Sequence, residues 1–138
     1  MWDKLKGPLW AAGARYDRVE SPATAPSFPD VVYTWNGHHG FIEMKTCAKG
    51  PKLDLSHFTS GQRNWLRERC TGKNVFLLVY VKADNPSDDS WHACRGALAW
   101  GLSDRPSMDE LEGYSTNVFR GDCMADVSLF TKWLKGWL

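Results

Sequence analysis

Residues 29–45 of the chain, PDVVYTWNGHHGFIEMK, carry its strongest local structural signals. The β-branched and aromatic residues from Val31 to Trp35 predict a β-strand. The dipeptide Asn36-Gly37 follows directly, and it is the short sequence most typical of a tight hairpin turn. Residues 40–46 are then expected to form the returning strand. The segment therefore predicts an antiparallel β-hairpin.

The hairpin brings three charged residues together. A two-residue turn places Asp30 opposite Glu43, whereas a four-residue turn places Asp30 opposite Lys45. In both registers the three side chains point from the same face, because side-chain direction alternates along a strand. Two adjacent carboxylates repel each other, and a divalent cation such as Mg²⁺, which is commonly held by one or two carboxylates, relieves that repulsion.

The chemistry of this trio fits hydrolysis of a phosphodiester. A lysine beside a metal-bound water can orient it, or can offset charge at the reacting phosphate. The alternative is that Glu43 and Lys45 form an ordinary salt bridge on one strand.

The rest of the chain alternates between helix and strand signals. A helix is expected from Pro8 to Ala14, whereas residues 15–20 fit either a strand or a helix end. Further elements are predicted as a helix from Thr59 or Ser60 to about Gly72, a doubly buried strand over 74–82, a strand over 91–102, irregular chain over 103–125, and an amphipathic helix over 126–138. This order predicts an α/β fold, a single domain over residues 1–138 with a central mixed β-sheet flanked by helices.

Composition limits the classes of function. The chain has 138 residues, of which 43% are hydrophobic, enough for one compact core. No apolar run approaches the roughly 20 residues of a membrane helix, and the N-terminal residues lack the apolar run of a signal peptide. A cytoplasmic protein is therefore expected. The four cysteines contain no C-x-x-C pair, which makes a zinc site a poor interpretation.

The net charge of +1 hides an uneven distribution. Residues 44–73 carry 7 basic and 2 acidic side chains, and residues 84–126 carry 3 basic and 9 acidic ones. A basic segment of this kind is compatible with binding a polyanion on one face. The alternative is a solvated helix face and loop.

Several segments in order resemble a known family. They are Arg18-Val19-Glu20-Ser21, Ser27-Phe28-Pro29-Asp30-Val31, Phe41-Ile42-Glu43-Met44-Lys45, Thr59-Ser60-Gly61-Gln62-Arg63-Asn64-Trp65-Leu66 and the apolar residues 75–81. Together they resemble the PD-(D/E)XK nuclease superfamily. Within it, they are most similar to small phage-type nucleases of the VRR-NUC and Holliday-junction-resolvase-like kind. The fold that this resemblance implies is the restriction-endonuclease-like core.

The resemblance also implies roles for individual residues. Asp30 and Glu43 match the metal-binding acids, and Lys45 matches the catalytic lysine. Met44 would complete the metal shell through its own or a neighbouring carbonyl. Glu20 matches an upstream acidic residue of the metal site, and Gln62 matches a glutamine near the active site. For these last two residues an exposed position at an element end remains the alternative.

The resulting hypothesis is a DNA endonuclease that depends on Mg²⁺, with Mn²⁺ as a substitute. Lys49, Lys52 and Arg63 are candidates for phosphate contacts, which position DNA without reading its sequence. Branched or duplex DNA would then be recognised by shape. The alternatives are a non-catalytic nucleic-acid-binding module on the same fold and a small structural protein.

Two further expectations concern assembly and origin. Two identical sites would suit two cuts in branched DNA, and the amphipathic helix over 126–138 is the candidate homodimer interface. A phage origin, implied by the resemblance alone, would place the protein in the host cytoplasm.

Overall fold

The computed structural model describes residues 1–19, 25–35, 37–70 and 74–121. Their elements are, in chain order, α1 (Trp2–Ala11), β1 (Arg15–Arg18), β2 (Val31–Trp35), β3 (His38–Ala48), α2 (Ser60–Arg69), β4 (Val75–Lys82), the 3₁₀ helix η1 (Pro86–Asp88), β5 (Ser90–Arg95), α3 (Gly96–Ala99), α4 (Met108–Tyr114) and β6 (Asn117–Arg120). Within these residues the strands form one six-stranded sheet in the order β1-β2-β3-β4-β5-β6. The β3–β4 pair is parallel and the other four pairs are antiparallel. The predicted mixed sheet flanked by helices is confirmed.

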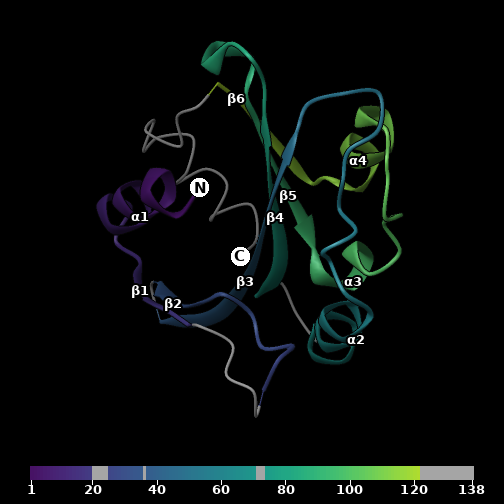
Figure 1. Cartoon of the computed structure of the whole chain (residues 1–138). Helices are drawn as coiled ribbons and strands as arrows, with labels where there is room; N and C mark the ends of the chain where they lie inside the picture. The colour runs from purple at the N-terminus through teal and green to yellow at the C-terminus, as the bar shows by residue number, and fades with distance from the viewer. Residues whose placement is uncertain (20–24, 36, 71–73, 122–138) are drawn as a thin grey trace.

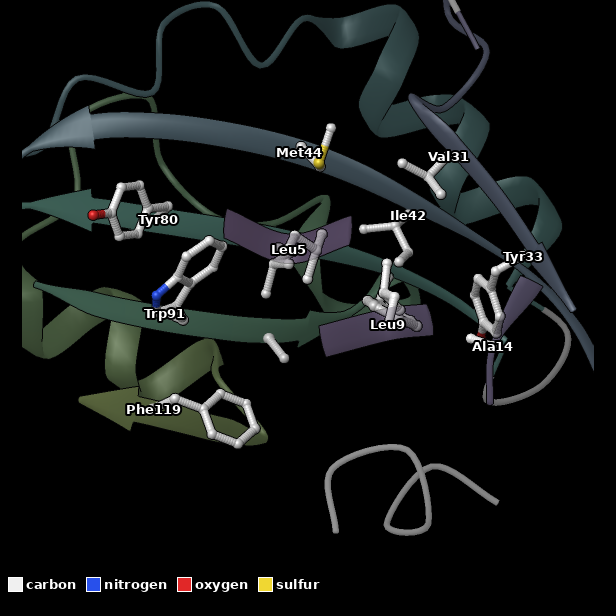
Figure 2. Close-up of a cluster of buried hydrophobic side chains, with 13 residues drawn as sticks. Leu5, Leu9, Ala14, Val31, Tyr33, Ile42, Met44, Tyr80, Trp91 and Phe119 are labelled. Atoms are coloured by element: carbon white, nitrogen blue, oxygen red, sulfur yellow. The ribbon is translucent and has the colours of Figure 1, made fainter. Parts of the chain in front are cut away.

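The sheet separates two hydrophobic cores (Figure 1). On one face α1 packs through Leu5 and Leu9, both fully buried, against Ile42, Trp91 and their neighbours (Figure 2). On the other face α2, α3 and α4 cover the remaining side chains of β4. Since β4 lies between the two cores, seven of its eight residues are buried, as its continuous apolar sequence predicts.

The hairpin adopts the register of a two-residue turn. Trp35 pairs with His38 and Val31 pairs with Ile42, and Gly37 has a φ of +80°, which suits glycine at such a turn. β3 is longer than predicted and continues six residues beyond Ile42. The edge of β3 beyond Ile42 therefore has no β2 residue paired with it. Asp30, which directly precedes β2, lies at this edge.

Helix α2 begins as predicted, with Thr59 as its N-cap. A capping box joins Thr59 and Gln62 through reciprocal side-chain to backbone hydrogen bonds. The helix contacts the loop before Asp30 through an aromatic cluster of Phe28, Phe41 and Trp65, whose ring centroids lie 5.2–5.8 Å apart. This cluster fixes the chain that leads into Asp30.

Three predictions about the other elements are wrong. The first helix begins at Trp2, so Pro8 lies inside it and not in its first turn. The predicted strand over 91–102 ends at Arg95, because Gly96 starts α3; a Cβ on Gly96 would lie 2.9 Å from the Val75 carbonyl oxygen, so only glycine permits this close packing. Residues 103–125, expected to be irregular, contain α4 and β6.

Two other expectations have different outcomes. Residues 15–18 form a strand, which settles the alternative left open there. The predicted helix over 126–138 lies outside the described residues. Among the helices that the structure describes, none is long and apolar enough to cross a membrane.

The hairpin depends on a close contact at Gly40, which gives a test of the fold. A Cβ at Gly40 would overlap the Tyr33 ring and the Asn74 carbonyl oxygen. We expect Gly40→Ala to lower the free energy of unfolding by about 2 kcal/mol or more, measured by urea denaturation. The matched control is Gly113→Ala in α4, where nothing lies within 4 Å of the added Cβ. It should raise stability by about 0.5–1 kcal/mol because alanine favours the helix. Equal effects of the two substitutions would contradict the described packing.

Candidate active site

The three charged residues of the hairpin meet where β2 begins. Asp30 directly precedes β2, and the register that pairs Val31 with Ile42 brings it alongside Glu43. The Met44 N–H donates a hydrogen bond of 2.8 Å to Asp30 Oδ2. The Asp30 side chain thus extends the hydrogen bonding along β3 past the last backbone pair, Val31 with Ile42. Lys45 Nζ donates to Glu43 Oε1 at 2.8 Å. The sequence therefore brings Asp30, Glu43 and Lys45 together as predicted.

Burial makes this arrangement electrostatically costly. Glu43 is 1% exposed and Lys45 is 7% exposed. Burial, and then the negative charge of Asp30, raise the pKa of Glu43 to about 7, while the charges of Lys45 and Arg18 act in the opposite direction. The two carboxylates are thus close enough to repel each other, which is the property that a cation site requires.

A cavity of about 330 Å³ opens beside these residues. It is lined by Met1, Trp2, Arg18, Asp30, Met44, Lys45 and Thr46. Asp30 and Lys45 reach the cavity directly, whereas Glu43 is buried almost completely. A phosphate entering the cavity would meet one carboxylate and two cationic side chains.

The donor set fits a hard divalent cation. In the described part of the chain no group of three His, Cys, Asp or Glu residues is placed to hold a metal, but Mg²⁺ needs only one or two carboxylates and completes its shell with water. Asp30 and Glu43 supply that number. The thioether of Met44 is turned into the core on the α1 side (Figure 2) and contacts the Arg18 Nη1 at 3.9 Å. A contribution from Met44 would therefore come from its backbone. Glu20 lies outside the described residues.

Gln62, the site residue predicted on the helix after the hairpin, caps the N-terminus of that helix, α2. Gln62 Oε1 accepts from the Thr59 N–H at 3.0 Å, and in the described structure no hydrogen bond joins Gln62 to Asp30, Glu43 or Lys45. Its position at the start of α2 is explained by the capping box. A catalytic role for Gln62 is not supported by these contacts.

The three candidate phosphate contacts differ. Lys49 and Lys52 are exposed in the loop after β3, and Lys49 lines a second cavity of about 500 Å³ at the carboxyl ends of β3 and β4, together with Lys82. Arg63 is instead committed to the protein. Its guanidinium donates to the carbonyls of Phe58, Trp100 and Leu102 and pairs with Asp104 at 3.0 Å. These contacts favour a structural role for Arg63, in which it links α2 to the loop after α3, over the predicted DNA contact.

Sequence reasoning gave no role to Arg18 and Trp2, both of which line the cavity. Arg18 pairs with Val31 across the β1–β2 ladder, next to Asp30. Had residues 15–18 been predicted as a strand paired antiparallel to the hairpin, Arg18 would have been placed beside Asp30. The sequence left these residues open between a strand and a helix end, so this position was not predicted.

Comparison with known proteins identifies the class of fold. No family model and no curated protein matches the chain. The solved structures do contain similar chains, and together with the mixed sheet and its flanking helices they define a resolvase-like, restriction-endonuclease-like fold.

One of these chains is Hjc, a Holliday junction resolvase from the archaeal hyperthermophile Archaeoglobus fulgidus. The TM-score is 0.50 with 19% sequence identity, over 79% of this chain and 87% of that chain. At this identity the similarity establishes the fold.

The raised pKa of Glu43 predicts a dependence of stability on pH. Because the folded chain holds the proton up to about pH 7 and the unfolded chain releases it near 4.5, Glu43 makes unfolding easier as the pH rises between these values. Glu43→Gln removes this contribution. In chelating buffer, the unfolding free energy of wild type should fall by about 2–3 kcal/mol more than that of the variant as the pH rises from 5 to 8. Parallel pH profiles of the two proteins in urea denaturation would contradict the burial of this carboxylate beside Asp30.

The reassignment of Arg63 is tested separately. Arg63→Ala leaves the partly buried carbonyls of Phe58 and Leu102 without their donor, so we expect it to lower the free energy of unfolding by about 1–3 kcal/mol. Lys52→Ala, which removes an exposed charge from the loop, should change stability by less than about 0.5 kcal/mol. Thermal and urea denaturation measure both effects. If Arg63→Ala were as stable as wild type, the guanidinium would be free to contact a ligand.

Proposed function

We propose that the chain is a metal-dependent DNA endonuclease of the PD-(D/E)XK class. The observation that carries the proposal is the meeting of Asp30, Glu43 and Lys45 beside a cavity at the start of β2. The same residues stand at the positions that the sequence resemblance assigns to the metal-binding acids and the catalytic lysine. The fold similarity to a Holliday junction resolvase supports the assignment.

Each of the three residues has a distinct task in this proposal. Asp30 and Glu43 hold Mg²⁺ or Mn²⁺, which when bound would offset phosphate charge and lower the pKa of a coordinated water. The Met44 N–H fixes one oxygen of Asp30 and so orients the carboxylate. Lys45 holds a proton at Nζ, where it pairs with Glu43, and is placed to orient the attacking water or to offset charge on the phosphate.

The proposed substrate is DNA recognised by its shape. The solved neighbour is named for Holliday junctions, and the sequence contains no base-reading motif such as a recognition helix. We propose that residues 1–138 act as one nuclease domain. A homodimer would place two such domains on a junction, and the expected products carry a 5′-phosphate.

Cleavage assays test this function directly. A supercoiled plasmid and a four-way junction are incubated with Mg²⁺, Mn²⁺ or a chelator. Lys45→Met should lower the cleavage rate by about 100-fold or more, because a positioned proton-carrying group contributes at least this much. Arg120→Met removes an exposed cation from β6, at the sheet edge farthest from β1. It should cleave within about twofold of wild type, as expected of a surface change away from the site.

Three outcomes separate the proposal from its alternatives. A folded sample that cleaves no DNA with any metal would sink the enzymatic function, and DNA binding without cleavage would favour the non-catalytic module. Cleavage unaffected by Lys45→Met would indicate another site or a contaminant. Calorimetric titration with Mn²⁺, repeated on Asp30→Asn, should show binding that the variant loses, whereas a structural protein would bind no cation.

A further inference from the structure

A row of aromatic and arginine side chains extends from the cavity along α1 and β1. Trp2 and Trp10 lie eight residues apart in α1, so they share one side of the helix. Tyr16 of β1 lies between them, with its ring centroid 4.9 Å from that of Trp2 and 6.1 Å from that of Trp10, both in edge-to-face geometry. We call these three rings, with Arg15 and Arg18, the aromatic ladder.

Each end of the aromatic ladder carries a guanidinium group. Arg15 Cζ lies 3.7 Å from the centroid of the Trp10 ring, and Arg18 Cζ lies 5.8 Å from that of Trp2. Neither arginine pairs with a carboxylate among the described residues. Asp17 points to the face of β1 opposite Tyr16 and Arg18, which is the face of Arg15, and Asp3 pairs with Lys6 at 3.0 Å. The ladder therefore carries two guanidinium groups beside the exposed ring of Trp10 and the partly buried rings of Trp2 and Tyr16.

The requirements of the core do not explain the whole ladder. Leu5 and Leu9 provide the fully buried contacts of α1. Trp2 and Tyr16 pack against the margin of that core, but Trp10 does not, and it is 54% exposed. A tryptophan this exposed, covered on one side by an arginine, is the kind of group on which nucleic-acid bases stack.

The ladder is continuous with the candidate active site. Trp2 and Arg18 line the same cavity as Asp30 and Lys45. A strand whose phosphate occupied that cavity would have its next nucleotides directed along Tyr16 towards Trp10. Charge complementarity and this continuity both identify a nucleic-acid strand as the occupant.

We propose that the aromatic ladder binds an unpaired DNA strand adjoining the cut. A base would stack on the exposed ring of Trp10 while Arg15 and Arg18 contact phosphates. A fully paired duplex has its bases stacked internally and offers the ladder only phosphates. The inference rests on the proposed nuclease function and narrows its substrate class to DNA with a single-stranded segment, such as a flap, a splayed end or an open junction.

Binding without cleavage tests the ladder independently of catalysis. Fluorescence anisotropy in chelating buffer measures the affinity of the full chain for a labelled short oligothymidylate and for a duplex of equal length. Trp10→Ala should weaken oligothymidylate binding by about 5- to 100-fold, whereas Trp10→Phe, which keeps an aromatic face, should restore most of it. The duplex affinity should change by less than about twofold, since phosphate contacts dominate there.

The chain contains a matched control for Trp10. Trp100 is 44% exposed and lies under Arg67 at 5.4 Å, but it follows α3 on the opposite side of the sheet. Trp100→Ala should bind oligothymidylate as wild type does. Circular dichroism confirms that each variant is folded. Equal binding by Trp10→Ala and wild type, or an equal loss in Trp100→Ala, would overturn the proposal.

Cleavage assays then distinguish two negative results: that the aromatic ladder does not bind DNA, and that the chain is not a nuclease. With Mn²⁺, Trp10→Ala should raise KM for a splayed-end substrate and leave kcat unchanged, because the ladder lies outside the reacting groups. Oligothymidylate binding that depends on Trp10, in a chain that cuts no DNA, would contradict the nuclease function alone. Cleavage with a KM independent of Trp10 would contradict the ladder alone.

Discussion

The hydrogen bond from the Met44 N–H to Asp30 Oδ2 is the constraint on which the candidate site depends. The backbone pairing between β2 and β3 starts at Val31. The carboxylate of Asp30, the residue before Val31, accepts the hydrogen bond from β3 that a further strand residue would otherwise accept. This fixes one carboxylate against the edge of β3, beside the buried Glu43. Without it, Asp30 would be free to turn into solvent, because repulsion from Glu43 favours that direction.

Keeping Glu43 and Lys45 buried requires support from both faces of the sheet. The parallel neighbour β4 is apolar along almost its whole length, and the cluster of Phe28, Phe41 and Trp65 closes the α2 side. These elements exclude water from the pair and so raise the pKa of Glu43. The surrounding core thus stabilises an arrangement that is itself unfavourable, as is common where charged groups serve a function.

Local chemistry made part of this structure predictable. The Asn36-Gly37 dipeptide predicted the hairpin and left two registers open, and strand alternation placed Asp30, Glu43 and Lys45 on one face in both; the observed register is that of a two-residue turn. Gln62 and Arg63 stand on the predicted helix, but their observed partners are not site residues. The Gln62–Thr59 capping box is a local contact with a sequence signature of its own, whereas the partners of Arg63 at residues 100–104 are tertiary contacts. The spacing of residues in the sequence cannot reveal which side of a helix faces the site and which faces another loop.

The charge distribution shows the same limit. Residues 44–73 have an excess of basic side chains, yet Arg63 is tied to the protein, and the guanidinium of Arg69 lies over Trp65 at 4.7 Å. Of the two cations beside the cavity, Lys45 of β3 belongs to this segment, and Arg18 of β1 lies far outside it in the sequence. A basic segment predicts a polyanion-binding face only if its side chains emerge together. Here the cations of the cavity are assembled from separate segments, because the antiparallel sheet brings the end of β1 next to the start of β2.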